Sequence, residues 1–123
     1  IERAGLTPGD IDHFLLPAPS AATAKMVAKH IGVGEDAIAG GLNETVGYSG
    51  SAHGLLMLVE TLERAKPGER ILLIGFGQGV DAIVIETKPA LADVVPANPV
   101  SAQLARGIAS DNYMRYLSIN GLV

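Results

Sequence analysis

The chain has 123 residues, a formal net charge of −4, 48% hydrophobic and 4% aromatic residues, and no cysteine. This length fits one domain, and the low aromatic share predicts a core of Ala, Val, Ile and Leu, as in packed α/β layers. The acidic balance and the lack of a Lys/Arg cluster argue against nucleic acid or a membrane surface as partner. Without cysteine, the chain has no disulfide, thiolate metal site or cysteine nucleophile of its own.

Two features of the chain bear on its context. The longest apolar runs, residues 55–59 and 71–74, are too short to cross a bilayer, and no signal peptide is visible, so the expected location is cytoplasmic. The chain begins at Ile1, in a segment with the pattern of a helix's last turn, and it lacks a start methionine. We therefore expect an excised domain that is truncated at its start.

The first part of the chain predicts a turn, a buried strand and an outer helix. Residues 7–10 (Thr-Pro-Gly-Asp) give a cap-and-turn signal, and residues 13–16 form a short apolar run that Pro17 ends. Ser20 can cap a helix that runs to residue 31, with Gly32 as its stop. The apolar stripe of this helix has helical spacing and leaves the other face wet: Ala24, Val27, Ala28 and Ile31.

The middle of the chain predicts a buried helix and a hairpin. Residues 34–41 form a loop that leads into a short strand near residues 37–42. The helix expected at about residues 51–64 is apolar on nearly every side, which requires protein all round it. Residues 70–75 and 80–87 are strands joined by a tight, glycine-rich connection.

The composition changes after residue 87. Three prolines in residues 88–100 predict a linker, and residues 101–123 predict a helical tail in two pieces, broken near residues 110–112. The segment 113–117 carries apolar surface that requires a partner. These boundaries divide the chain into a domain at residues 1–87, a linker and a tail.

The connection at residues 75–79 (Gly-Phe-Gly-Gln-Gly) is the first candidate site. It is not a dinucleotide fingerprint, because a β-rich run follows it and its glycines alternate. Two interpretations stay open: a hairpin that needs glycine dihedral angles, and a functional loop whose exposed backbone amides meet a ligand.

The histidines and serines give weaker signals. His53 begins the apolar helix. A lone histidine at a helix start more often has a hydrogen-bonded structural role, and a catalytic role is the alternative hypothesis. His13 and His30 are expected to be structural or passive, and the three histidines share no metal-ligand spacing, so no metal is expected. Ser49 and Ser51 lack the context of a nucleophile elbow. The residues alone predict an α/β half-domain with a glycine-walled cleft.

Four stretches resemble the C-terminal half of the thiolase superfamily, in the branch of the ketoacyl-acyl-carrier-protein synthases III and hydroxymethylglutaryl-CoA synthases. They are residues 5–12 (Gly-Leu-Thr-Pro-Gly-Asp-Ile-Asp), 15–17 (Leu-Leu-Pro), 66–73 (Lys-Pro-Gly-Glu-Arg-Ile-Leu-Leu) and 75–79. The resemblance covers about residues 5–87. It implies one half of a five-layer thiolase-like architecture, with a mixed β-sheet, one central buried helix between sheets and one outer helix.

Residues 47–53 (Gly-Tyr-Ser-Gly-Ser-Ala-His) are similar to the Gly-Asn/Asp-Thr-Gly-Ala-Ala-His of synthase-like proteins associated with a zinc-ribbon/OB-fold domain, and residues 113–123 are similar to the segment that follows in those proteins. The resemblance implies acyl-CoA as substrate or ligand and no further cofactor. It implies a pocket lined by Gly47, Tyr48, Ser49, Gly75, Gly77, Gln78 and Gly79. The implied partners are the missing N-terminal half and the zinc-ribbon/OB-fold domain. A homo-oligomer is expected from the uncovered apolar surface, and no nucleic acid and no membrane is expected as partner.

The chain departs from the family where its chemistry lies. In the synthases, a histidine and an asparagine from this half donate hydrogen bonds to the thioester oxygen. The histidine position falls at Ala18 or Pro19 and the asparagine position at Tyr48 or Val46, while Asn43 lies three or more residues out of register.

Two hypotheses follow from the resemblance and its departures. The first is an acyltransferase of the hydroxymethylglutaryl-CoA synthase type, with Tyr48 and His53 as substitute catalytic candidates. In it the cysteine nucleophile comes from the missing half, and the fragment alone is inactive. The second is a catalytically degenerate module that binds acyl-CoA or serves as a scaffold. The missing histidine and asparagine favour the second, and the glycine hairpin is neutral between them.

Overall fold

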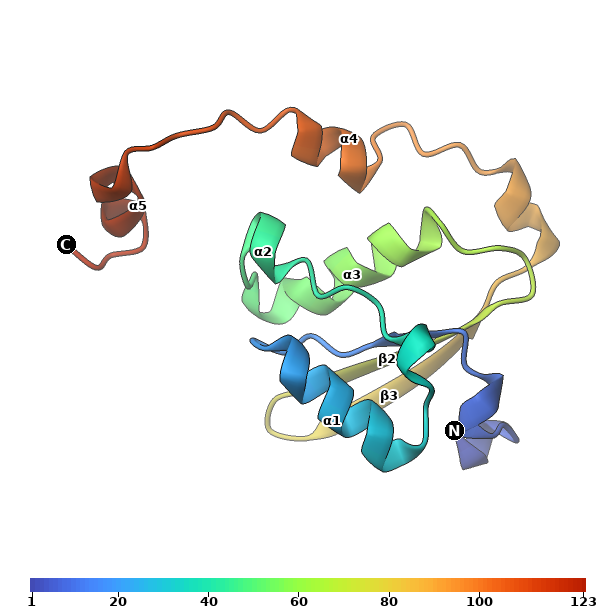
Figure 1. The fold of residues 1–123 in the computed structure, drawn as a ribbon. Helices are drawn as coiled ribbons and strands as arrows, with labels where there is room; N and C mark the ends of the chain where they lie inside the picture. The colour runs from blue at the N-terminus through green and yellow to red at the C-terminus, as the bar shows by residue number, and fades with distance from the viewer.

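The computed structural model describes residues 1–123 and has a three-stranded sheet at its centre (Figure 1). The strands are β1 (His13–Leu15), β2 (Arg70–Phe76) and β3 (Val80–Glu86), in that spatial order. β1 runs parallel to β2, with Phe14 opposite Leu72, whereas β2 and β3 form an antiparallel hairpin. The sheet is therefore mixed, as predicted.

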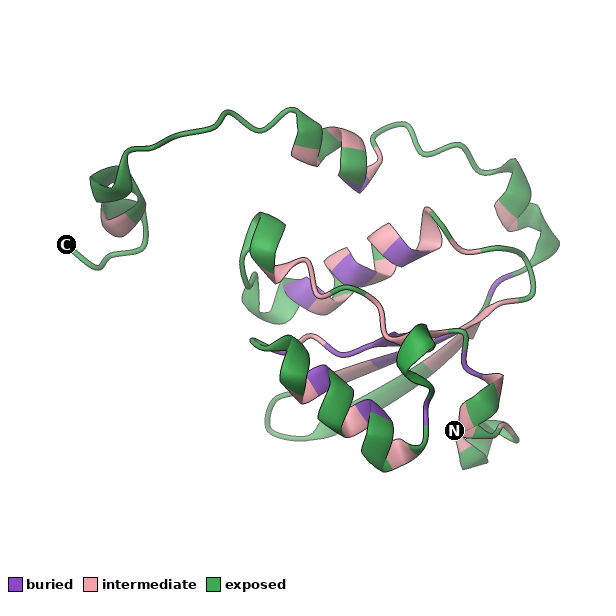
Figure 2. Cartoon of the chain, in the orientation of Figure 1, coloured by how far each residue is buried: buried purple, intermediate pink, exposed green.

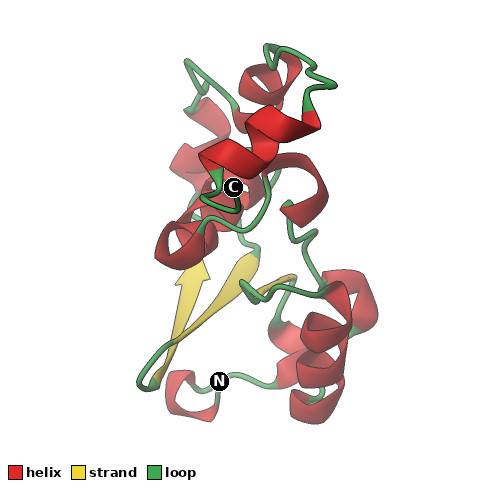
Figure 3. Ribbon diagram, turned by 90° about the vertical axis from the view of Figure 1, so that its left-hand side faces the viewer, coloured by secondary structure: helices red, strands yellow, loops and turns green.

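Five α-helices and five 3-10 helices accompany the sheet. The α-helices are α1 (Ala21–Ile31), α2 (Asn43–Val46), α3 (His53–Leu62), α4 (Val100–Ala105) and α5 (Tyr113–Ile119). The 3-10 helices are Glu2–Ala4, Pro8–Asp10, Glu35–Ala37, Gly50–Ala52 and Pro89–Asp93. Figure 3 shows the strands from another side, with helices on either side of them.

Helix α1 has the bounds that its sequence predicts. The Ser20 side chain accepts a hydrogen bond from the Ala22 N–H at 3.2 Å, and Gly32 ends the helix with φ 80°, in the left-handed region that glycine adopts most easily. Ala24 and Ala28 are buried against the sheet, and the rest of the helix is half-buried or exposed. This is the predicted outer helix.

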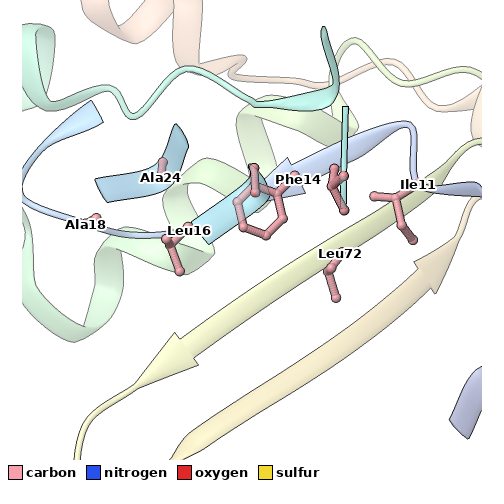
Figure 4. Close-up of a cluster of buried hydrophobic side chains, with 8 residues drawn as sticks. Ile11, Phe14, Leu16, Ala18, Ala24 and Leu72 are labelled. Carbon is pink, nitrogen blue, oxygen red and sulfur yellow. The ribbon is translucent and has the colours of Figure 1, made fainter. Parts of the chain in front are cut away.

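Alternation along the strands divides the core into two clusters on opposite faces of the sheet. Successive strand side chains point to opposite faces, so Leu72 packs toward α1 while its neighbours Ile71 and Leu73 pack toward α3. The α1 cluster, drawn in Figure 4, contains Ile11, Phe14, Leu16, Ala18, Ala24, Ala28, Val33 and Leu72. The α3 cluster contains Leu15, Met57, Ile71 and Leu73.

Helix α3 is covered on one face only in this chain, whereas its apolar pattern predicts a helix that needs protein all round it. His53, Met57 and Thr61, spaced four residues apart, are buried against the sheet. Leu55 and Val59 lie on the other side and are 63% and 49% exposed. The green and pink bands along α3 in Figure 2 mark the uncovered side. Helix α3 is thus buried on the side that faces the sheet and exposed on the opposite side.

The strand predicted near residues 37–42 is wrong. Glu35–Ala37 is a 3-10 helix, and Ile38 alone forms a parallel bridge to Phe14. Two glycines then follow, and Leu42 adopts φ 57°, which leaves the extended region altogether. Leu42 instead precedes the short helix α2, which begins at Asn43 and which the sequence did not predict.

The C-terminal part of the chain returns to α3 before leaving it. Within the predicted linker, Pro89–Asp93 forms a 3-10 helix. Val100, the first residue of α4, is buried, and its N–H donates to both carboxylate oxygens of Glu63, the residue that follows α3, at 2.8 and 3.0 Å. Helix α5 follows after residues 106–112 and lies away from the sheet (Figure 1). Its large side chains, Tyr113, Met114, Tyr116 and Ile119, are exposed.

Candidate functional site

An open cleft of about 570 Å³ lies where the β2–β3 hairpin meets the start of α3. One wall is residues 73–79 with Asp81 and Ile83, and the other is Pro17, Tyr48, Gly50, Ser51, Gly54 and Leu55. Five of the seven predicted pocket residues line it: Tyr48, Gly75, Gly77, Gln78 and Gly79. Gly47 and Ser49 do not line it.

The sequence did not single out Phe76, Asp81 or Pro17 as cleft residues. Phe76 stands between the glycines of the predicted loop, and Pro17 ends the first strand, so both lay beside recognised signals. Asp81 reaches the cleft from the start of β3. Only the pairing of the two strands reveals which of their residues flank the hairpin loop.

The hairpin glycines are not required by the backbone of this chain. None of Gly75, Gly77 and Gly79 has a φ in the left-handed region, and a Cβ on any of them would meet nothing within 4 Å. Turn geometry and crowding inside the chain therefore do not explain them. Because these glycines have no side chains, a ligand in the cleft can come close to the backbone of the hairpin loop.

The hairpin loop also presents backbone donors. Gly77 N–H donates to Gly79 O at 2.9 Å and closes the loop, whereas the N–H groups of Gln78 and Gly79 donate to no group within the chain. Both residues are exposed. These two amides can meet an acceptor oxygen of a ligand in the cleft.

Tyr48 is held between two glycines with unusual backbone angles. Gly47 has φ 70° and ψ −180°, a combination that essentially only glycine adopts, and Gly50 has φ 58°. The Tyr48 side chain is 50% exposed, and its ring lies 5.1 Å from the ring of His53, centroid to centroid, at 43°. Tyr48 thus has one side in the cleft and one side against a buried ring.

His53 is fully buried and lies behind the cleft rather than in its lining. Its Nδ1 accepts from the Ser49 N–H at 3.3 Å, and its Nε2 lies 2.5 Å from the carbonyl oxygen of Gly41. A carbonyl oxygen only accepts, so Nε2 carries the proton and the ring is the neutral Nε2–H tautomer. Both ring nitrogens are therefore engaged by backbone groups.

The two positions where the family has its histidine and asparagine donors show no such pair in the cleft. Ala18 is buried in the α1 cluster, and Pro19 has neither a side-chain nor a backbone donor. Asn43 donates its Nδ2–H to Ala18 O at 2.8 Å and does not line the cleft. Tyr48 and Asp81 are the ionisable residues of the lining.

His13 forms a separate pair at the other end of β1. Its Nε2 lies 2.8 Å from Glu69 Oε2, which also accepts from the Lys66 N–H at 2.8 Å. The hydrogen bond from His13, and after it the bond from the Lys66 backbone, lower the pKa of the Glu69 carboxyl. The pair ties the start of β1 to the turn before β2, and it is remote from the hairpin loop.

Two further properties of the structure concern metals and membranes. It contains no group of three or more His, Cys, Asp or Glu side chains arranged to hold a metal ion. None of its helices combines the length and the hydrophobicity needed to cross a membrane.

The fold, a mixed sheet with a helix on each face and a glycine hairpin beside the central helix, is that of a thiolase-like half-domain. The family described as 3-oxoacyl-[acyl-carrier-protein] synthase III C terminal matches residues 1–86. The chain belongs to this family, within the thiolase superfamily.

Curated relatives extend the match over the whole chain. A hydroxymethylglutaryl-CoA synthase from Aeropyrum pernix is 36% identical over 124 residues, which span 98% of this chain and 34% of the relative. Those from Methanosarcina mazei and Caldivirga maquilingensis are 30% and 27% identical, and each match covers 100% of this chain and 36% of the relative. The chain therefore spans about a third of the length of these relatives.

Proposed function

We propose that this chain forms the C-terminal wall of an acyl-thioester site in a hydroxymethylglutaryl-CoA synthase-like acyltransferase, and that it is inactive by itself. The observation that carries the proposal is the cleft, which brings Tyr48 together with the whole glycine loop at residues 75–79. The two regions are about thirty residues apart in sequence; the glycine loop is a candidate from its residues, and Tyr48 is one from the family resemblance. The similarity to hydroxymethylglutaryl-CoA synthases also supports an acyl-thioester site.

The cleft supplies donors rather than a nucleophile. A thioester carbonyl placed against residues 77–79 can accept from the N–H groups of Gln78 and Gly79, and Tyr48 in the opposite wall carries a further donor, its hydroxyl. Donors of this kind stabilise negative charge on the thioester oxygen, and losing one typically lowers a rate about 100- to 1,000-fold. The chain has no cysteine, so an acylated nucleophile has to come from elsewhere in the protein.

A second candidate function is a module that binds acyl-CoA without condensing it. The specific observation in its favour is the lining of the cleft, which contains neither histidine nor asparagine. The buried ring of His53 reaches the cleft only if it gives up both of its backbone partners. In this case Tyr48 and the hairpin amides bind the thioester and nothing in this chain moves a proton.

The partners follow from the uncovered surfaces. The exposed side of α3, with Leu55 and Val59, and the exposed hairpin residues Phe76 and Ile83 form the surface on which we place the N-terminal half. A zinc-ribbon/OB-fold domain reached through the tail at residues 113–123, and a homo-oligomer, complete the proposal.

The first experiment is the intact mass of the full-length protein after incubation with a panel of acyl-CoA thioesters. A covalent acyl adduct supports the acyltransferase, tight binding without an adduct supports the binding module, and no binding at all refutes both. Gly77→Val adds a side chain where a Cβ meets nothing within 4 Å, so it narrows the cleft without crowding the chain. It should weaken binding about tenfold or more, which corresponds to about 1.4 kcal/mol. Gly34→Val is the matched control, because Gly34 has the same free space, an ordinary φ of −62°, and no place in the cleft.

A further inference from the structure

The segment 41–49 is a loop closed by one side chain. The imidazole of His53 donates from Nε2 to Gly41 O at 2.5 Å and accepts at Nδ1 from the Ser49 N–H at 3.3 Å. Gly41 is the first residue of the segment and Ser49 the last, so the ring joins its two ends. The ring is fully buried, and water therefore does not compete for either bond.

The backbone of this segment needs such a closure. Leu42 has φ 57°, a left-handed conformation that bulky residues avoid, and Gly47 has angles that only glycine tolerates. Conformations of this kind persist only where the surroundings over-determine them. The His53 bonds lie immediately outside these two residues, one position before Leu42 and two positions after Gly47.

A second contact fixes the segment to the body of the domain. Asn43 Nδ2 donates to Ala18 O at 2.8 Å, which attaches α2 to the turn after β1. This bond restrains the first half of the segment, whereas the contacts of His53 restrain the half that contains Tyr48. Tyr48 is the residue next to Ser49, and its ring packs 5.1 Å from the imidazole that holds Ser49 in place.

We propose that His53 is a positioning residue: by closing the segment 41–49 at both ends, it holds the Tyr48 side chain in the wall of the cleft. The role rests on the proposed function in so far as the cleft binds an acyl thioester. His53 acts through Tyr48 and does not touch the ligand, in contrast to a proton-transfer role for the same ring. The chemistry required of residue 53 is one acceptor at the Nδ1 position and one donor at the Nε2 position.

Two isosteric substitutions separate the two bonds. His53→Asn places its amide oxygen near the Nδ1 position, so it keeps an acceptor for the Ser49 N–H and loses the donor to Gly41. His53→Gln places its amide nitrogen near the Nε2 position, so it keeps the donor to Gly41 and loses the acceptor. The bond to Ser49 is the one next to Tyr48, and His53→Gln is therefore the more damaging change for the cleft.

The first measurement is hydrogen exchange at residues 47–50 in the full-length protein. Ser49 lies in an exposed loop, and its amide is protected through His53 Nδ1. Exchange of the Ser49 amide should be about tenfold faster in His53→Gln than in the wild type and close to wild type in His53→Asn. Equal exchange in the wild type and His53→Gln would overturn the proposal. This measurement needs no ligand, so it stands even if the protein binds no acyl-CoA.

The second measurement is a double-mutant cycle on the dissociation constant for acetyl-CoA, with Tyr48→Phe as the second change. If His53 acts through Tyr48, His53→Gln weakens binding in the wild-type background and adds no further loss to Tyr48→Phe. Independent, multiplying losses overturn the positioning role. Gly47→Ala strains the same segment without altering His53, and it should reproduce the loss if a His53 variant fails to fold. Absence of acetyl-CoA binding by the wild type refutes the proposed function alone.

Discussion

Thr61 offers a sharp test of the α3 packing, because its hydroxyl is buried without a partner. The residue is fully buried on the sheet side of α3, and Oγ1 makes no hydrogen bond. A buried hydroxyl that lacks a partner lowers stability by about 1–3 kcal/mol relative to an apolar group of the same shape. Valine has that shape and a similar helix propensity. Thr61→Val should therefore raise the free energy of unfolding by about 1–2 kcal/mol.

Thr87 provides the matched control. It is also buried, but its Oγ1 lies 2.6 Å from Lys66 O and 3.0 Å from Glu69 O, so it closes the turn before β2. Thr87→Val makes the same chemical change and should lower the free energy of unfolding by about 0.5–1.5 kcal/mol, because it removes the hydrogen bond of the hydroxyl while both carbonyls keep a backbone donor. The assay is equilibrium urea unfolding followed by circular dichroism, at one protein concentration for all three proteins. Equal effects of the two substitutions would refute the reasoning, which rests on hydrogen bonding and not on side-chain volume.

Three further predictions concern the pair of Glu69 with His13, the contact between α4 and the end of α3, and an uncovered apolar surface. The pKa of the Glu69 carboxyl is lowered from its ordinary 4.5, so the hydrogen bonds that Glu69 accepts from His13 and from the Lys66 N–H stabilise the fold at neutral pH and are lost as the pH falls below 4.5. In Glu69→Gln the free energy of unfolding should therefore depend less on pH in that range. Glu63→Ala removes both acceptors of the Val100 N–H, and α4 should then be cleaved about tenfold faster in limited proteolysis, whereas Glu60→Ala should leave it unchanged. The chain by itself should self-associate through Leu55, Val59 and neighbouring apolar side chains, and a clean monomer in sedimentation at high concentration would count against this.

The sequence predicts helix α1 well because all its determinants are local. Ser20, the apolar stripe and Gly32 lie within thirteen consecutive residues, and each acts through neighbours in the chain. The hairpin is similar: its strands are continuous and its turn is short, and the structure only extends β2 to Phe76 and ends β3 at Glu86.

The segment 41–49 shows where local signals fail. Its first two residues, Gly41 and Leu42, are predicted as the end of a strand, but Leu42 adopts a left-handed conformation. The side chain that closes the segment is the ring of His53, more than ten residues further on. No propensity favours leucine at such an angle. A histidine at a helix start gives no sign of which carbonyl it will bind. The residues predict the glycine wall of the cleft, and the family resemblance adds Tyr48, but neither predicts that His53 supports Tyr48 from behind.

The parallel pairing of β1 with β2 has a consequence for the order of folding. His13 pairs with Ile71, and the whole of α1, α2 and α3 lies between them in the chain. The β2–β3 hairpin needs only a three-residue loop, whereas β1 can join it only after this long connection has been closed. During synthesis, β1 and α1 leave the ribosome before the strand that completes their core exists. Phe14 and Leu15 are fully buried in the folded domain, but they stay exposed in the nascent chain until residues 70–86 have been synthesised. During this time the nascent chain is prone to aggregation.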